Sequence, residues 1–496
     1  MITRRELLKA GLTAGAVSVF SGTVGGLSAF AQSGPVMRRS LHGMALDDPD
    51  LAAYRDFVGL MLAKDQNDPV SWLQYSLMHG RYGGNYRYCP HGDWYFLPWH
   101  REFVLMYERA VRALTGHTAF AMPYWDWTVD RTMPQAFTDP TYNGKPNPLY
   151  VPNRTLNTSN WPLPDAWVSQ KVLDEKVYSQ TNFQLFGTSK NPKQDSLDMA
   201  WVVRGGGVQG FLEGTPHNLI HNSIGAFMPS AGSPRDPIFM MHHGNIDRIW
   251  ANWNALGRSN TDDMSPTDRN LWMNMYFKDN YLTPTGQTYG AYPRDLQDIR
   301  ALGYTYPGLP TPDNAMPDES RDARLLSLLS ADTTLENLRV LPAANTEAAT
   351  LRAPLVRRVR MPSTLKSQVL APMGAARDDA EVFALIRDME VGPDVSSVRV
   401  FVNADALTPQ TPDTDPHFAG EIGFLAHPDS GEGHEAHGKA PPSAMIDLTS
   451  TVRDLAGRGL LKDDRISVHL IPVLRDGARD GAGARVVPAS IEIVVA

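Results

Sequence analysis

The sequence predicts a mainly α-helical fold, a four-helix bundle with long loops, followed by an all-β, sandwich-like C-terminal domain. Two patterns predict this division. Apolar residues recur at helical spacing in four segments of the first two thirds of the chain, whereas apolar and polar residues alternate in the last third. With 42% hydrophobic and 20% charged residues, the 496-residue chain can fill sizeable cores.

The first 31 residues are predicted to be a twin-arginine signal peptide and not part of the fold. Arg4 and Arg5 precede a weakly apolar run, and the sequence AFA ending at Ala31 offers small residues at the two positions that determine cleavage. We therefore expect the twin-arginine translocon to export the protein to the periplasm or the medium. The alternative is an uncleaved membrane anchor, although no other stretch is long and apolar enough to span a bilayer.

Apolar periodicity near 3.6 residues predicts four helices. Prolines and capping residues mark where they start. They are residues 69–78, a helix with Pro98 in its first turn that closes near Gly116, a helix that starts at Thr215-Pro216, and a helix from Pro237 to Trp253. Residues 128–199 are dense in Pro, Asn and Thr and are expected to form long loops over this scaffold.

The last third predicts strands. Alternating segments occur at residues 398–402, 466–471 and 491–495, separated by Gly, Pro and Asp turns. The predicted parts are therefore the signal peptide 1–31, a helical domain 32–341, a polar linker 342–355 and a β-rich domain 356–496.

Composition argues against two classes of protein. The formal net charge of −8, with no basic stretch, argues against a nucleic-acid binder. The single cysteine, Cys89, excludes a disulfide framework.

Six of the 14 histidines occupy informative positions. His217 and His221 are four residues apart, so they share a face of the third predicted helix, and His243 lies in the fourth. Two helix pairs could thus bring six imidazoles to the middle of a bundle, where bundle metal sites form. The other three stand at the end of the first helix, in the loop after Cys89 and in the first turn of the second helix: His79, His91 and His100.

Chance spacing is the alternative, because a single HxxxH pair is common. His242 and His243 point about 100° apart on a helix, so at most one of them faces the site. Sites made only of imidazoles suit copper or zinc, whereas hydrolytic two-metal sites usually include bridging carboxylates. Three histidines on each side, without carboxylates, favour a pair of copper ions, and a di-zinc hydrolase is the competing interpretation.

The segments CPHGDWYFLPWHREFVLMYER, PYWDWT, LEGTPHNLIHNSIG and DPIFMMHHGNIDRIW resemble those of the tyrosinases and polyphenol oxidases, the type 3 copper enzymes. The resemblance covers about residues 40–340, and the four segments occur in the family's order. It implies ortho-hydroxylation of phenols and oxidation of o-diphenols to o-quinones, with O2 as co-substrate. It also implies two copper ions, one held by His79, His91 and His100 and the other by His217, His221 and His243, and it selects His243 over His242.

In fungal members of the family, a cysteine two residues before the middle ligand of the first copper is joined to that histidine by a thioether bond. Cys89-Pro90-His91 has this form, so the resemblance implies a Cys89–His91 crosslink that would fix the ring and remove an oxidisable thiol. The alternative is an unmodified cysteine packed beside the site.

Further roles also follow from the resemblance. In the family, a glutamate and an asparagine at the positions of Glu213 and Asn218 are thought to hold a water that acts as base toward the phenol. The alternatives are a capping or surface carboxylate for Glu213 and a solvated helix residue for Asn218. Asp247 is expected to orient a ligand imidazole or to pair with Arg248. Ser230 is expected at the substrate entrance over the second copper.

Residues 355–496 resemble the C-terminal domain of plant-type polyphenol oxidases, chiefly in the segments VFVN and FAGE. The resemblance implies a module that covers the mouth of the active site and keeps the enzyme latent, with Phe418 as a candidate plug. The loop with His427, His434 and His437 would bind copper in transit or would simply be solvated.

Two alternatives remain within this family: an enzyme that oxidises only catechols, and a dioxygen-binding protein with the same copper pair. The expected partners are small phenolic substrates. After removal of the signal peptide, we expect neither nucleic-acid binding nor stable membrane insertion.

Overall fold

The structure is a computed structural model of the whole chain. It describes residues 34–82, 86–157, 161–262, 264–312, 322, 325–327, 329, 343–344, 347–360, 381–425, 440–461 and 465–495. From Pro35 onward these residues belong to one compact unit. The predicted signal peptide lies outside them. None of the helices within the described ranges is both long and apolar enough to cross a membrane.

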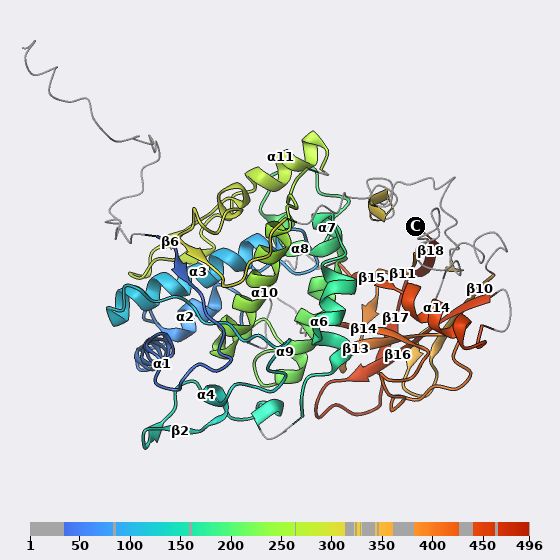
Figure 1. Cartoon of the computed structure of the whole chain (residues 1–496), viewed down its shortest axis with the longest axis horizontal. Coiled ribbons are helices and arrows are strands. Elements are labelled where there is room, and N and C mark those ends of the chain that lie inside the picture. The colour runs from blue at the N-terminus through green and yellow to red at the C-terminus, as the bar shows by residue number, and fades with distance from the viewer. Residues whose placement is uncertain are drawn as a thin grey trace, which may run out of the picture. The chain divides into compact units, whose positions relative to one another are not determined.

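The helical part is organised around α3 (Phe96–Thr115) and α10 (Ile238–Ala255), which pack against each other (Figure 1). Gly116 ends α3 in the left-handed conformation (φ 76°), which glycine adopts without steric cost. The other longer helices are α1 (Pro49–Leu62), α2 (Trp72–Leu77), α9 (Asn218–Ile224) and α11 (Pro266–Asn274). Shorter helices interrupt the predicted loops: α4 (Gln135–Thr138), α5 (Asp165–Val168), α6 (Gln170–Val172), η2 (Leu173–Val177), α7 (Phe183–Phe186) and α8 (Ala200–Arg204).

All four predicted helices start within a few residues of the expected positions, including the one predicted at Thr215-Pro216. Thr215 has an extended backbone (φ −150°, ψ 117°) inside the π-helical turn η3 (Glu213–His217). The residue before a proline avoids the helical region for steric reasons, so α9 begins only at Asn218. His217 keeps helical dihedrals (φ −52°, ψ −59°) and therefore still lies one turn before His221.

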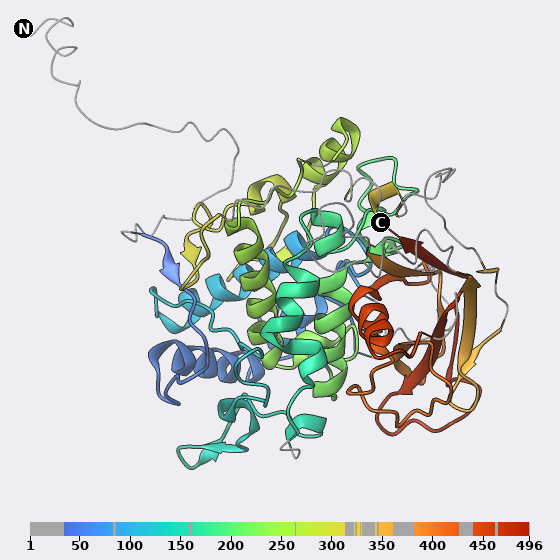
Figure 2. The same cartoon turned by 45° about the vertical axis from the view of Figure 1, so that its right-hand side comes forward.

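The C-terminal part is a β-sandwich, as predicted. One sheet has the strand order β10-β16-β13-β14 and the other the order β4-β15-β11-β18-β8. Side chains from both sheets, among them Val400 and Ile491, share one apolar core, which the orange to red strands in Figure 2 enclose. The strands are β10 (Leu355–Arg360), β11 (Val382–Arg387), β13 (Val395–Val402), β14 (Phe418–Gly423), β15 (Ser443–Asp447), β16 (Arg465–Leu474) and β18 (Ser490–Val495), and helix α14 (Thr449–Gly457) packs beside them.

The two parts are interleaved more closely than a polar linker would suggest. Strand β4 (Val208–Gln209), from the helical part, pairs in parallel with β15 at Val208↔Ser443. Within the predicted linker, β8 (Ala343–Ala344) pairs with β18, and β9 (Ala349–Thr350) pairs with β17 (Arg485–Val487). Residues 343–344 and 349–350 are therefore strand, because their backbone groups find partners along the sheet edges.

Candidate metal centre

The first histidine trio comes from two helices and the loop between them. His79 lies just beyond the end of α2, His91 lies in the loop, and His100 lies in the first turns of α3. Their ring centroids are 5.3 to 5.8 Å apart, and all three rings are buried. With Cys89, they offer ligand atoms that lie within 4.8 Å of one another.

The second trio is tighter. His217 and His221 flank the first turn of α9, and His243 lies in α10. The Nε2 atom of His243 is 3.4 Å from that of His217 and 3.2 Å from that of His221. Three imidazole nitrogens therefore converge on one point in the protein interior.

The two trios face each other. The ring of His100 stacks on that of His243 with centroids 4.3 Å apart, and the ring of His91 stacks on that of His217 at 5.7 Å. Phe239 lies against both groups, 5.3 Å from His79 and 4.1 Å from His243. The six predicted histidines thus form one buried cluster between α2, α3, α9 and α10.

Hydrogen bonds fix the tautomer of most of these rings. A carbonyl oxygen can only accept, so each ring nitrogen that bonds to one carries the proton, and the opposite nitrogen keeps its lone pair. The Nδ1 donors and their acceptors are His79 to Ala231 O (2.7 Å), His100 to Phe96 O (2.8 Å), His221 to Met228 O (2.8 Å) and His217 to Asn218 Oδ1 (2.9 Å).

Burial keeps the rings neutral. It lowers the pKa of His100 to about 3 and that of His221 to about 4. Burial, together with the neighbouring imidazoles, also lowers the pKa values of His217 and His243 well below the ordinary value. Neutral imidazoles are the form that binds metal ions, so the cluster is ready to bind them at neutral pH.

The donor set fits metal ions. In the second trio, nitrogen lone pairs lie 3.2 to 3.4 Å apart, an arrangement that a cation between them would stabilise. Imidazole-only sets of three suit copper, as the sequence indicated.

Cys89 lies beside both ligands that follow it. Its Sγ atom is 3.4 Å from Nδ1 and 3.8 Å from Nε2 of His91, so the sulfur faces the ring edge between the two nitrogens. It is also 3.2 Å from Nε2 of His100, a proximity that the sequence did not predict.

Glu213 and Asn218 are both buried beside the second trio. Glu213 Oε1 accepts from the backbone N–H of Gly92 at 2.7 Å, next to His91, and Oε2 accepts from the hydroxyl of Thr188. Asn218 accepts from His217 and donates to Gly423 O at 3.0 Å. Glu213 is therefore not a surface carboxylate, and Asn218 is not a solvated helix residue.

Asp247 does neither of the things predicted for it. Its carboxylate is buried between two arginines, accepting from Arg101 at 2.6 Å and from Arg38 at 3.0 Å, and it also accepts from the hydroxyls of Tyr304 and Tyr306 at 2.7 Å each. Arg248 pairs instead with Asp126. Asp247 sits one turn beyond His243 on α10, and its carboxylate is occupied by Arg38, Arg101 and two tyrosine hydroxyls, so it braces the bundle.

His242 is a feature that sequence reasoning left aside. Its buried ring stacks against that of His217 at 5.3 Å and meets His221 edge-on at 4.8 Å. Within the part of the chain that the structure describes, neither of its ring nitrogens has a hydrogen-bond partner. Its nitrogens belong to the same potential ligand group as those of the second trio.

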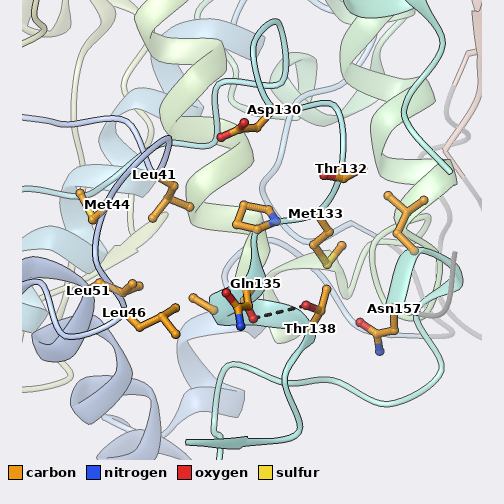
Figure 3. A pocket seen from close by; sticks show the side chains of 13 residues that line it. Leu41, Met44, Leu46, Leu51, Asp130, Thr132, Met133, Gln135, Thr138 and Asn157 are labelled. Carbon is orange, nitrogen blue, oxygen red and sulfur yellow. Dashed lines mark hydrogen bonds between the residues drawn. The ribbon is translucent and has the colours of Figure 1, made fainter. Parts of the chain in front are cut away.

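Ser230 lines a cavity of about 550 Å³ beside α9. Trp161, Trp167 and Arg475 also line it, so residues of the C-terminal sandwich form one wall. The next residue, Ala231, supplies the carbonyl that orients His79. A second cavity, of about 440 Å³, is lined by Leu41, Met133 and Gln135, among others, and contains none of the six histidines (Figure 3).

Phe418 packs away from the histidines, contrary to its predicted role as plug. Its ring contacts Phe401 at 5.4 Å and lies under the guanidinium of Arg399 at 4.9 Å. Phe418 begins β14, whereas the opposite end of the strand reaches the histidine helix: Gly423 accepts from Asn218. The loop with His427, His434 and His437 lies outside the described residues.

Comparison with known proteins supports the same interpretation. The profile of the common central domain of tyrosinase matches residues 69–256, a range that includes all six histidines. Over 497 aligned residues, the chain is 28% identical to (+)-larreatricin hydroxylase of Larrea tridentata, covering 92% of this chain and 78% of that one. It is 26% identical to the tyrosinase HcTyr1 of Hahella sp. (strain CCB-MM4), with 86% and 93% covered, and 28% identical to a polyphenol oxidase of Malus domestica, with 85% and 73% covered.

Two solved structures share the fold over nearly the whole chain. A latent aurone synthase (polyphenol oxidase) superposes with a TM-score of 0.63 at 21% identity, covering 94% of this chain and 90% of that one. Latent apple tyrosinase superposes with a TM-score of 0.61 at 23% identity, covering 94% and 98%. The helical domain and the sandwich therefore occur together in both.

Proposed function

The chain belongs to the tyrosinase and polyphenol oxidase family of type 3 copper proteins, and on that premise we propose that it hydroxylates monophenols at the ortho position and oxidises o-diphenols to o-quinones. Its cofactor is a pair of copper ions, with O2 as co-substrate. When bound, the copper pair supplies the redox chemistry between O2 and the phenol.

The observation that carries this proposal is the cluster of six buried imidazoles. His79, His91 and His100 would hold one copper and His217, His221 and His243 the other. The stacking of His100 on His243, at 4.3 Å, sets the two groups close enough to act on one small molecule. Their carbonyl partners hold the rings, so little reorganisation is needed when metal binds.

Two further residues support activity on monophenols. A phenol has a pKa near 10, so its proton must be removed before or during reaction at neutral pH. In our proposal Glu213 serves as the base, acting through a water, and the bond from His217 to Asn218 holds the amide beside the same ligand.

The test compares a monophenol with its catechol on the copper-loaded, activated protein. Turnover of tyrosine and of DOPA is measured for the native chain and for Glu213→Gln. We expect both substrates to react in the native chain, and the glutamine variant to lose at least about a hundredfold in monophenol turnover, as expected for general-base catalysis. Turnover of DOPA alone would establish a catechol oxidase, and no turnover of either would favour dioxygen binding.

We further propose that the protein is made as a latent precursor. Support comes from the contacts between β14 and the elements that carry the second trio. Thr215 donates to Glu421 O, Asn218 to Gly423 O, and Asn222 Nδ2 to Phe424 O at 3.1 Å. The sandwich thus binds directly to α9 and η3, where it would restrict access for substrate.

A thioether bond between Cys89 and His91 is also proposed, because the sulfur faces the ring edge that carries Cε1. The bond would form with loss of the thiol hydrogen and the ring hydrogen, O2 being the oxidant. The peptide that contains both residues should then be about 2 Da lighter than its sequence mass, and the copper-loaded chain should not react with thiol reagents. An unchanged mass would leave Cys89 as a thiol packed beside the site.

Export through the twin-arginine translocon is proposed from Arg4 and Arg5. In a bacterium that has this translocon, replacing both arginines with lysine should leave the precursor inside the cell. Continued export of the variant would contradict the proposal.

A further inference from the structure

Both carboxylate oxygens of Glu213 accept hydrogen bonds. Gly92 N–H donates to Oε1 at 2.7 Å. The single hydrogen of the Thr188 hydroxyl has two acceptors within reach, Gly187 O at 2.6 Å and Glu213 Oε2, and an ionised carboxylate oxygen is the stronger acceptor. The carboxylate is fully buried, so these donors replace water. A donor to an ionised carboxylate gives a strong hydrogen bond and favours the charged form.

The backbone around Thr188 is itself held rigidly. Residue 188 bridges to Gln209, Ser189 N–H donates to Val208 O at 3.0 Å, and Gly210 N–H donates to the Thr188 hydroxyl oxygen at 3.4 Å. A Cβ on Gly210 would lie 2.3 Å from Gly187 O, so the two segments approach as only glycine permits.

The same backbone hydrogen-bond network reaches the loop that carries His91 of the first trio. Gly207 N–H donates to Gly92 O at 2.9 Å, and Gly92 N–H donates to Glu213. Glu213 is therefore surrounded by three segments that are joined by backbone hydrogen bonds: residues 187–189, residues 207–210 and the loop at Gly92. From this network, Thr188 directs a side-chain hydroxyl at Glu213.

We propose that Thr188 is a positioning residue for monophenol hydroxylation, fixing the Glu213 carboxylate in the orientation in which it accepts the phenol proton through water. This inference rests on the proposed role of Glu213. Without the hydroxyl, Oε2 loses this donor, and the carboxylate is held less firmly in one orientation. The base then spends less time in the productive geometry.

The test uses the full-length, copper-loaded chain under one activating condition. Thr188→Val keeps the shape of the side chain and removes the donor, and Thr188→Ser restores it. We expect the ratio of monophenol to catechol turnover to fall about tenfold in the valine variant, the factor expected for one hydrogen bond to a charged group, and to recover in the serine variant. Ser189→Ala is the matched control, because that hydroxyl accepts from Val208 N at 2.8 Å in the same network and does not bond to Glu213.

A second readout uses phenol acidity. A more acidic phenol needs less help from a base, so the deficit of Thr188→Val relative to the native chain should shrink as the phenol pKa falls. A deficit independent of phenol acidity, or one shared by Ser189→Ala, would assign Thr188 a structural role and overturn the inference.

Glu213→Gln distinguishes a failure of the positioning role of Thr188 from a failure of the proposed function. If it lowers the turnover ratio while Thr188→Val leaves the ratio unchanged, the positioning role is wrong and the proposed function stands. If Glu213→Gln leaves the ratio unchanged, the proposed base is wrong, and the role of Thr188 falls with it.

Discussion

In three of the ligand histidines, the hydrogen bond that Nδ1 donates decides which ring nitrogen faces the other ligands. The carbonyls of Ala231, Phe96 and Met228 take the Nδ1 protons of His79, His100 and His221. These three acceptors belong to the protein backbone, so the orientation of these rings is part of the fold, whereas His217 bonds to the Asn218 side chain. The adjacent His242 and His243 differ in where their Nε2 atoms point. His243 directs its Nε2 atom at His217 and His221.

This difference predicts unequal effects of two neighbouring substitutions. His243→Asn should reduce bound copper from about two to about one per chain and abolish oxidation, because the second trio loses a ligand. His242→Asn should retain about two copper ions, since it is His243 that points Nε2 at the other two ligands of the trio. Copper and protein are measured on the same purified samples. Loss of one copper in the His242 variant, with two retained in the His243 variant, would reverse the assignment.

Asp247 carries a different kind of prediction. Replacement with asparagine leaves two buried arginines without their shared carboxylate, which should cost about 3–5 kcal/mol of unfolding free energy. The matched control is Asp262→Asn, an exposed partner of Arg269 at 3.8 Å, which should change the free energy by less than about 0.5 kcal/mol. Urea unfolding measures both.

The same carboxylate predicts a pH dependence. Burial alone would raise the pKa of Asp247, but Arg101 and Arg38 lower it below the ordinary value. A lowered folded-state pKa means that the stabilisation is complete above about pH 4, where the unfolded carboxyl titrates, and is lost as the pH falls toward the folded value. Below pH 4 the native chain should lose stability more steeply than Asp247→Asn. Parallel pH profiles would contradict this.

At the scale of elements, β14 and α9 form the contact that joins the sandwich to the second trio. Their backbones come so close that a Cβ on Gly423 would lie 2.8 Å from Asn218 Cβ and 2.9 Å from Leu219 N. Small side chains and a row of amide-to-carbonyl hydrogen bonds therefore hold β14 on the helix. Latency in this protein would depend on that close approach.

Gly423→Val should weaken this contact. Overpacking costs about 1–3 kcal/mol, which would shift the docking equilibrium about fivefold or more toward the open form. Catechol oxidation by the full chain without activator should rise by a similar factor. Gly457→Ala is the control, because a Cβ there meets nothing within 4 Å. Unchanged basal activity in Gly423→Val, with native copper content, would show that β14 does not limit access.

At the scale of the whole molecule, the helical part and the sandwich are joined by many contacts besides the connecting chain. Lys176 donates to Ala419 O at 3.0 Å, Arg475 donates to Asn222 Oδ1 at 3.3 Å, and β4 extends the sheet of β15. Cutting the connection should therefore not release the sandwich by itself.

After a nick in the chain before β8, we therefore expect the two fragments to co-elute still. Catechol oxidation by the nicked protein should remain low. Activity should rise several-fold only when mild detergent separates the fragments. Size-exclusion chromatography with an activity assay on each fraction tests this. Full activity in co-eluting fragments would show that the connection itself imposes latency.

Local patterns predicted the helices, the strands and the six histidines, because helical and strand periodicity and short motifs report local structure. They did not predict the partners of Asp247, since Arg38 and Tyr304 lie far away in sequence. The wrong position of Phe418 has the same origin, because strand register across two domains is a long-range property. Thr188 beside Glu213 gave no local signal at all.

The central claim is that two trios of buried imidazoles hold two copper ions in one chain. Metal analysis of the purified, active, full-length protein tests this most directly. We predict two copper ions per polypeptide, with oxidation of catechol lost and regained in step with copper removal and reloading. A protein that is fully active with one copper or none, or with zinc in its place, would contradict the account.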